Sequence, residues 1–248
     1  MIKIKSYGSG SKGNFYLVSN SETNIVLECG IDLDNIFKAF NRNNLSFQKV
    51  NACITSHHHE DHSMCIKHFD DYDIKCYCTY DTKNRYNISD NNYIQLVDNK
   101  VYKINTIQVM TLSVNHGSAE CYGFIFKDRN NMILFITDFM KCSKVLKSFP
   151  FNEIFIECNY IEENWQQQRF YNDGITEELE RKYKRQLNTH QSLENLLIHL
   201  KNMNLNKCDK ITLIHISQDL GDKDLMKNTI IEEFGIDCVA LLPNGIEY

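Results

Sequence analysis

The sequence predicts an α/β fold, and three observations support this prediction. Short apolar runs that are typical of strands alternate with segments that have the 3.6-residue spacing of amphipathic helices. Histidine and aspartate residues follow several of these runs directly, as expected where the loops at strand ends build a site. With 42% hydrophobic and 11% aromatic residues, the 248-residue chain can form a sizeable core as one large domain or two small ones.

The chain begins with a predicted β-meander. Residues 1–6 alternate apolar and polar side chains, as a half-buried edge strand does, and strand-like runs follow at 15–18 and 24–29. The glycine-rich stretch 8–14 lacks the Gly-Lys-Ser/Thr ending of a phosphate loop, and a strand follows it. We expect it to be a tight strand connection; the alternative is that its backbone N–H groups face a site.

The later elements follow from apolar runs, helical spacing and turn residues. Asp32 or Asp34 can cap the first helix, and Asp128-Arg129-Asn130-Asn131 is typical of a hairpin turn. Further strands are expected at 50–54, 74–78, 93–97, 107–114, 121–126, 132–136, 153–157, 211–214 and 237–242. Helices are expected at 32–43, 61–69, 191–203 and 222–234, and residues 162–186 form a polar region with helical stretches.

The stretch Thr55–Ser63 holds four of the nine histidines and follows the buried strand 50–54. His57 and His59 are two residues apart, so in an extended segment they point the same way and can hold one metal ion. Asp61 and His62 lie on the turn into the next helix and point elsewhere, so they can hold a second ion. These residue types are standard zinc ligands; the alternative is a run of solvated polar residues.

His116, Asp138 and His215 lie in the same position relative to a strand as His57 does, directly after an apolar run. A single histidine after a strand is more often an ordinary packed or solvent-facing residue. Four ligand-type residues in one topological position favour a metal site.

Charge and cysteine usage limit the class of protein. The net charge of −5 and the isoelectric point of about 6.0 argue mildly against a long nucleic-acid footprint. The ten cysteines are scattered and no signal peptide precedes them, which predicts reduced thiols in a cytoplasmic protein. No apolar run approaches the length of a membrane span, so we expect no membrane partner.

The His-x-His-x-Asp-His arrangement from His57 to His62 resembles the signature of the metallo-β-lactamase superfamily, with His58 and Glu60 as spacers. The resemblance implies an αββα sandwich, two mixed β-sheets flanked by helices, as a single domain over residues 1–248. It also implies two Zn²⁺ ions per chain, with Mn²⁺ as an alternative. The implied ligands are His57, His59 and His116 for the first ion, Asp61, His62 and His215 for the second, and Asp138 as the bridge.

Three further segments resemble one branch of that superfamily. The stretch 8–14 resembles the opening of YycJ-like proteins, and the segment from Glu157 to Tyr160 resembles their Glu-Ala-Asn-His/Tyr segment. His190-Gln191-Ser192, followed by a helix and by His215, is similar to the tRNase Z pattern. This implies that His190 is a general acid or phosphate ligand, with a solvent-facing histidine as the alternative. Glu157 and Asn159 either orient ligands or close a strand.

The chain lacks a long Gly/Pro-rich insertion like the tRNA-gripping arm of tRNase Z. In size and acid balance it is most similar to the compact phage anti-Pycsar phosphodiesterases. This resemblance implies hydrolysis of cyclic CMP or cyclic UMP by a homodimer in the host cytoplasm, with His190, Asp61 and Asp138 as catalytic residues. Trp165 and Phe170 either stack on a base or pack in a core. The alternatives are a DNA or RNA nuclease, a thioester or lactam hydrolase, and a protein that only sequesters nucleotides.

Overall fold

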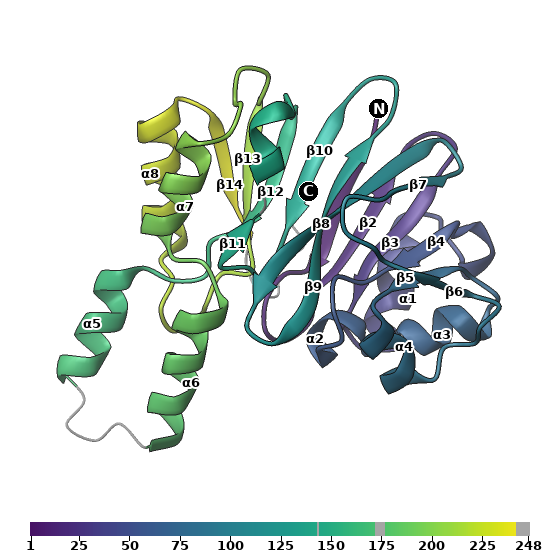
Figure 1. Ribbon diagram of the computed structural model, residues 1–248, viewed down its shortest axis with the longest axis horizontal. Helices are drawn as coiled ribbons and strands as arrows, with labels where there is room; N and C mark the ends of the chain where they lie inside the picture. The colour runs from purple at the N-terminus through teal and green to yellow at the C-terminus, as the bar shows by residue number, and fades with distance from the viewer. Residues whose placement is uncertain (143, 172–176, 242–248) are drawn as a thin grey trace.

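Two β-sheets pack face to face in the computed structural model, and helices cover both outer faces (Figure 1). The structure describes residues 1–142, 144–171 and 177–241, with the backbone alone for 142, 144, 145 and 168–171. The strands are β1 Lys3–Gly8, β2 Phe15–Ser19, β3 Asn24–Cys29, β4 Ala52–Ile54, β5 Cys76–Cys78, β6 Tyr93–Gln95, β7 Val101–Ile104, β8 Ile107–His116, β9 Ala119–Lys127, β10 Met132–Ile136, β11 Lys141–Cys142, β12 Glu153–Glu157, β13 Lys210–Ile214 and β14 Asp237–Ala240. The α-helices are α1 Leu33–Arg42, α2 Glu60–Ser63, α3 Ile66–Asp71, α4 Tyr80–Tyr86, α5 Glu162–Tyr171, α6 Glu177–Thr189, α7 Leu193–Lys201 and α8 Lys223–Phe234.

The first sheet has the strand order β1-β2-β3-β4-β5-β6. Its first three strands are antiparallel, so the predicted meander is confirmed. From β3 to β6 the strands are parallel. The carboxyl ends of β3 and β4 therefore lie at the same edge of the sheet, and the stretch Thr55–Ser63 begins at this edge.

The second sheet has the order β11-β8-β9-β10-β12-β13-β14, and β7 also pairs with β8. The long hairpin of β8 and β9 is antiparallel and runs in register from Gln108 opposite Lys127 to His116 opposite Ala119. Strands β10, β12, β13 and β14 are parallel. Three parallel strands therefore deliver the residues that follow Ile136, Glu157 and Ile214 to one edge.

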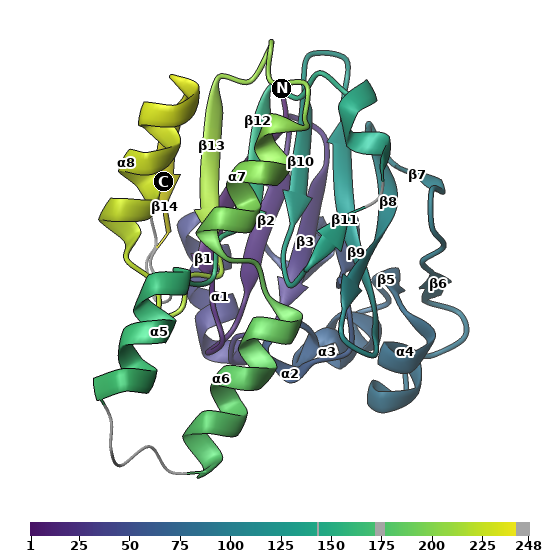
Figure 2. The same cartoon turned by 60° about the vertical axis from the view of Figure 1, so that its left-hand side comes forward.

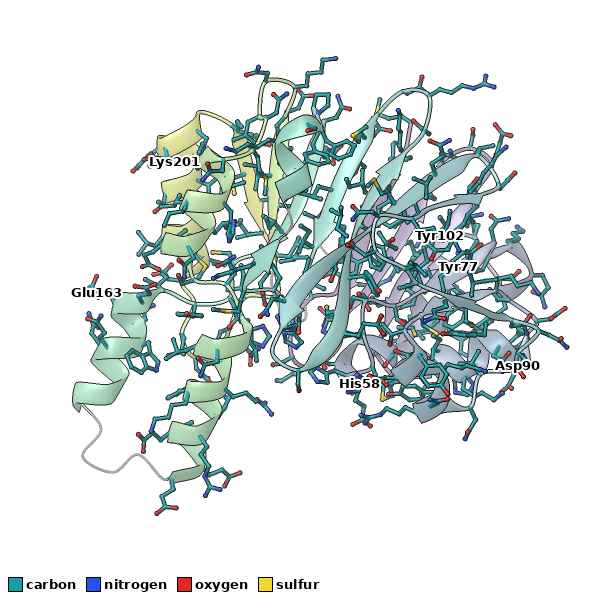
Figure 3. All side chains as sticks on the ribbon, in the orientation of Figure 1. His58, Tyr77, Asp90, Tyr102, Glu163 and Lys201 are labelled. Atoms are coloured by element: carbon teal, nitrogen blue, oxygen red, sulfur yellow. The ribbon has the colours of Figure 1, made fainter. Side chains whose placement is uncertain are left out.

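Three apolar layers form the core. Between the sheets, Tyr16 of β2 packs edge to face on Phe135 of β10 with ring centroids 4.9 Å apart. Tyr77 of β5 meets Tyr102 of β7 in the same way at 5.4 Å, which joins the two sheets near one side (Figure 3). A second layer lies between the first sheet and α1 and α3, and a third lies between the second sheet and α7 and α8.

The helix expected at 61–69 is two helices, α2 and α3. Cys65, between them, has helix-ending backbone angles (φ −100°, ψ 8°), and its N–H donates to the carbonyl of Cys29 at 2.9 Å. The stretch therefore bends back against β3. The short elements α4, β7 and β11 were not predicted, because each offers too few residues for a periodic pattern.

Helices α5 and α6 project beyond the sandwich on the side of the second sheet (Figure 2). A small cluster of Tyr160, Tyr183 and Leu220 joins them to the body, and Trp165 packs against it. The nine cysteines whose side chains the structure describes are buried and free of disulfides. Within residues 1–142, 144–171 and 177–241 no helix is both long and apolar enough to cross a bilayer.

Candidate metal centre

The predicted ligands converge at one edge of the sandwich, where strands of both sheets end. Stretch Thr55–Ser63 comes from the first sheet, whereas His116 ends β8, Asp138 follows β10 and His215 follows β13. Asp138 (φ 50°) and His215 (φ 54°) have left-handed backbone conformations, as has Glu28 of β3 (φ 58°). This conformation is uncommon for residues other than glycine, and it is concentrated at functional sites.

Four of these residues form the first cluster. His57 Nε2 lies 2.8 Å from His59 Nδ1, and His116 Nε2 lies 3.3 Å from the same nitrogen. Asp138 Oδ2 lies 3.9 Å from His57 Nε2 and 3.5 Å from His116 Nε2. The outer ring nitrogens of His57 and His116 have their own partners: His57 Nδ1 faces Ser56 Oγ at 2.9 Å, and His116 Nδ1 faces the carbonyl of Thr189 at 2.9 Å. These partners fix the ring orientations, as is usual for metal-binding histidines.

The second cluster contains Asp61, His62 and His215. His62 Nε2 lies 3.4 Å from Asp61 Oδ2 and 3.4 Å from Asp138 Oδ1. His215 Nε2 lies 3.8 Å from Asp61 Oδ2 and is buried without a hydrogen-bond partner among the described residues. The two oxygens of Asp138 thus face different clusters, which is the arrangement expected of a bridging carboxylate.

Glu157, at the end of β12, is a buried carboxylate that contacts two histidines. Its Oε1 lies 2.7 Å from His190 Nδ1 and 2.8 Å from His215 Nδ1. Its Oε2 accepts hydrogen bonds from the N–H groups of Phe139 and Gln191. The His190 ring stacks on that of His215 with centroids 5.2 Å apart and retains 17% exposure of its side chain. His190 is therefore held at the edge of the clusters with access to solvent.

Burial and neighbouring charges determine the protonation of the first cluster. Burial, followed by the neighbouring histidines, lowers the pKa of His57 well below its ordinary value and that of His59 to about 4. Neutral imidazole is the form that binds metals.

In the second cluster the carboxylates outweigh burial. Burial acts to lower the pKa of His62 and His215, but Asp138 and the other nearby carboxylates raise both, that of His215 to about 10. Burial acts to raise the pKa of Asp138, but His215 and His62 lower it well below its ordinary value. The carboxylates that stabilise these protonated rings would equally stabilise a bound cation.

Three supporting residues were not predicted as part of the site. Glu28 is fully buried, accepts a hydrogen bond from the Ser56 N–H, and lies 3.5 Å from His62 Nδ1. Asn14 Nδ2 donates to the Asp61 carbonyl and lies 3.1 Å from His62 Nε2, while Ser9 Oγ accepts from the His215 N–H. A charged residue inside the apolar run 24–29 was the only sequence signal for Glu28. The glycine-rich stretch contacts the site through these two side chains and through the backbone N–H of Asn14, which donates to the same Asp61 carbonyl at 2.8 Å.

Asn159 contacts the site through its side-chain amide, which reaches the backbone of His215. Its Nδ2 donates to the carbonyl of His215 at 2.7 Å. His58 and Glu60 lie outside the metal-capable groups that the described residues form, and His58 lies at the same end of the molecule as α2 (Figure 3). Trp165 of α5 is half-buried against the small cluster of Tyr160, Tyr183 and Leu220. The Phe170 side chain lies outside the described residues.

The donor set fits divalent metal ions. Nitrogen and carboxylate oxygen atoms lie within 4.8 Å of one another in each of three groups, of which one also contains Glu157 and His190. Imidazole and carboxylate ligands suit Zn²⁺ and also Mn²⁺ or Fe²⁺. The buried, unpartnered His215 Nε2 is an atom that such an ion would satisfy. The clusters are able to bind metal; the sequence-predicted division of ligands between two ions stays a prediction.

A family model described as "Beta-lactamase superfamily domain" matches residues 23–216, more than three quarters of the chain. Comparison with curated proteins finds no match.

Several solved structures share the fold. The metallo-beta-lactamase fold protein YhfI from Bacillus subtilis is 15% identical, with a TM-score of 0.74 over 98% of this chain and 97% of that one. A diphosphatase from the PhnP family is 13% identical, with a TM-score of 0.67 over 100% of this chain and 98% of that one. Human tRNase Z, short form, is 10% identical, with a TM-score of 0.64 over 99% of this chain and 99% of that one. These similarities confirm the predicted sandwich of two mixed sheets flanked by helices.

Proposed function

Because this chain belongs to the beta-lactamase superfamily, we propose that it is a metal-dependent phosphodiesterase that hydrolyses cyclic mononucleotides of the cyclic CMP or cyclic UMP type. The observation that carries the proposal is the Glu157–His190 pair beside the metal-capable clusters. One fold relative is named a diphosphatase and another a tRNase Z, which supports phosphate-ester chemistry.

Two divalent ions are the proposed cofactors. His57, His59 and His116 would hold one, Asp61, His62 and His215 the other, with Asp138 between them. Such ions supply Lewis-acid chemistry: they activate water at neutral pH and neutralise charge on a phosphate. The chain's own contribution to their sites is a set of preoriented rings, because Ser56, Thr189 and Glu157 each contact the outer nitrogen of a ligand histidine.

His190 is the proposed general acid. Glu157 contacts its Nδ1, so Nε2 is the nitrogen that remains for substrate. Burial acts to raise the pKa of Glu157, but His190 and His215 lower it, so this carboxylate is ionised at neutral pH and orients the His190 ring through its contact with Nδ1. Attack of water on phosphorus breaks the bond to the ribose oxygen, and His190 donates the proton that this oxygen needs.

A small substrate fits the charge of the molecule. The net charge is −5, and most of the cations on the projecting helix α6 have acidic partners. Lys182 pairs with Asp219 at 2.7 Å, and Lys184 pairs with Glu180 at 2.7 Å. A long polyanion would have to compete with these pairs. We further propose that the protein acts as a homodimer in the cytoplasm of a host cell.

Nuclease activity on DNA or RNA is the second candidate. Arg181, Lys182, Lys184 and Arg185 give α6 four cations in five positions, and the helix ends at Thr189, next to His190. Arg185 has no ion-pair partner in the described chain. A strand bound along α6 would reach the metal centre, so this helix is the observation that favours a nuclease.

The test is incubation of the zinc-loaded protein with 2′,3′- and 3′,5′-cyclic nucleotides and with single-stranded DNA, followed by chromatography of the products. We expect cyclic CMP or cyclic UMP to be linearised, and His59→Ala and Asp61→Ala to abolish this activity. His68→Ala is the matched control, because His68 is an exposed histidine on α3 outside the clusters. Degradation of DNA with no opening of any cyclic mononucleotide would establish the nuclease instead.

A further inference from the structure

A cationic pocket lies on the outer side of the stretch 8–14. It has a volume of about 210 Å³, and its lining includes Tyr7 of β1, Lys12 and Gly13 of the stretch 8–14, and Lys38 and Arg42 of α1. Asp32 is the one acidic residue in this lining. Three cations and one carboxylate leave two net positive charges in the pocket, whereas the whole chain has a net charge of −5.

The charges in this pocket are available to a ligand. In the described part of the chain, Lys12, Lys38 and Arg42 form no ion pair, although Lys38 Nζ donates to Asn35 Oδ1 at 3.1 Å. The carboxylate of Asp32 is already engaged as the cap of α1: it accepts hydrogen bonds from the N–H and the side-chain amide of Asn35, both at 2.8 Å. Its engagement in the cap leaves the three cations as the free charged groups of the pocket.

The pocket shares one loop with the metal centre. On one side of the stretch 8–14, Asn14 contacts Asp61 and His62, and on the other side Lys12 and Gly13 line the pocket. Figure 2 shows that β1 and α1, which flank the pocket, lie beside each other at one side of the sandwich. A ligand held there would be a neighbour of the site and would not occupy it.

We propose that this pocket binds a phosphate group other than the one that the metal centre would hydrolyse. Clustered lysine and arginine side chains without acidic partners are the chemistry that recognises phosphate, and arginine adds a planar pair of donors. The phosphate can belong to a free nucleotide or to a nucleic-acid strand that continues past the metal centre. The inference goes beyond the proposed function, since binding needs no turnover.

The test measures binding to the full chain in EDTA, where no metal-dependent turnover occurs. The probes are inorganic phosphate, a 5′-mononucleotide and a fluorescent 12-residue single-stranded DNA. The variant is Lys38→Gln with Arg42→Gln, two exposed positions on α1 where glutamine preserves the helix. The matched control is Lys103→Gln with Lys127→Gln, which removes the same charge from a different cavity. Circular dichroism checks that both variants are folded.

We expect the Lys38/Arg42 variant to bind at least one probe about tenfold more weakly, and the control to bind as the unmodified chain does. If the ligand is a strand, the DNA loses affinity and the slope of log K against log salt falls by about 1.4, that is, about 0.7 for each lost contact. If the ligand is a small phosphate, inorganic phosphate and the mononucleotide lose affinity instead.

Equal affinity of the variant and the unmodified chain for all three probes would overturn the proposal, as would an equal loss in the control. If the chain binds the probes in this pocket but hydrolyses no phosphodiester, the proposal of a phosphate-binding pocket stands and the proposed function is refuted.

Discussion

Gly30 lies so close to the metal-binding stretch that any side chain would displace it. A Cβ atom at Gly30 would lie 1.9 Å from the carbonyl carbon and oxygen of Asp61. We therefore predict that Gly30→Ala destabilises the fold by more than about 2 kcal/mol and weakens metal binding, because the backbone of Asp61 and His62 must move. Thermal unfolding and metal analysis of the purified variant measure the two effects.

Gly235→Ala is the control for this prediction. Gly235 ends α8 with φ 65°, and nothing lies within 4 Å of its added Cβ. Alanine there costs about 1 kcal/mol through backbone conformation alone and leaves metal content unchanged. Equal metal content in the Gly30 variant and the unmodified chain would contradict the argument.

Glu157 is predicted to act on the reaction through the two histidines that it contacts. Glu157→Gln keeps the shape of the side chain but removes its charge, so it should lower kcat about 10- to 100-fold and have a smaller effect on KM. Loss of this charge should also move the alkaline limb of the pH–rate profile to lower pH, because a neighbouring carboxylate favours the protonated form that a general acid needs. Kinetics across pH on a small phosphodiester measure both effects.

Glu153→Gln on the same strand is the matched control, since Glu153 lies at the other end of β12. A rate equal to that of the unmodified chain in the Glu157 variant would show that the carboxylate only closes the strand.

Some ligand histidines were predictable because they are dense in the sequence and the others because each directly follows an apolar run, whereas their supports were not predictable. Glu28 reaches Ser56 over 28 positions, and Ser9 reaches His215 over 206. Such contacts depend on how the two sheets align, and no local pattern encodes that alignment. The role of Glu157 was left open for the same reason, because its partners lie 33 and 58 positions away.

At the scale of elements, Asp70 joins α3 to the segment before β6. Its buried carboxylate accepts hydrogen bonds from the side chains of Lys67, Ser89 and Asn92 and from the Ser89 N–H. Burial acts to raise the pKa of Asp70, but these partners lower it. We predict that Asp70→Asn costs about 2 kcal/mol at pH 7.

The destabilisation caused by Asp70→Asn should become smaller as the pH falls. Because the pKa in the folded state is lowered, the stabilisation by Asp70 is fully present above the unfolded pKa of about 4 and is lost as the pH falls through the folded value. Denaturant unfolding from pH 7 to pH 3 should therefore show the variant and the unmodified chain converging in acid. Asp71→Asn is the control, since Asp71 also contacts Lys67 but is 57% exposed. A difference that persists unchanged at pH 3 would rule out the charge as its source.

Most elements were predictable, and the errors have local causes. The expected helix at 191–203 begins only at Leu193, because Ser192 caps it by accepting from the Asn195 N–H at 3.1 Å. The expected helix at 61–69 is divided at Cys65 by a bond to β3, which is a contact between elements. Apolar spacing predicts that a segment is helical, but the point at which it breaks depends on what it packs against.

At the scale of the whole molecule, the metal centre joins the two sheets. Four of its ligand-type residues follow β4 of the first sheet, and three come from β8, β10 and β13 of the second. Ions held at this edge would link residues of the two sheets to each other. Their binding free energy would then add to the stability of the fold, since the unfolded chain brings no such group of ligands together.

We therefore predict that zinc raises the thermal midpoint and that EDTA lowers it. At a zinc concentration of 100 times the dissociation constant, each site adds about 2.7 kcal/mol, which corresponds to a rise of roughly 5–10 °C for a chain of this size. His59→Ala should lose most of this response, whereas His68→Ala, at an exposed histidine, should retain it. Differential scanning calorimetry with and without zinc measures the shift. A midpoint that responds to neither zinc nor EDTA would mean that the convergent histidines of the two sheets do not hold an ion.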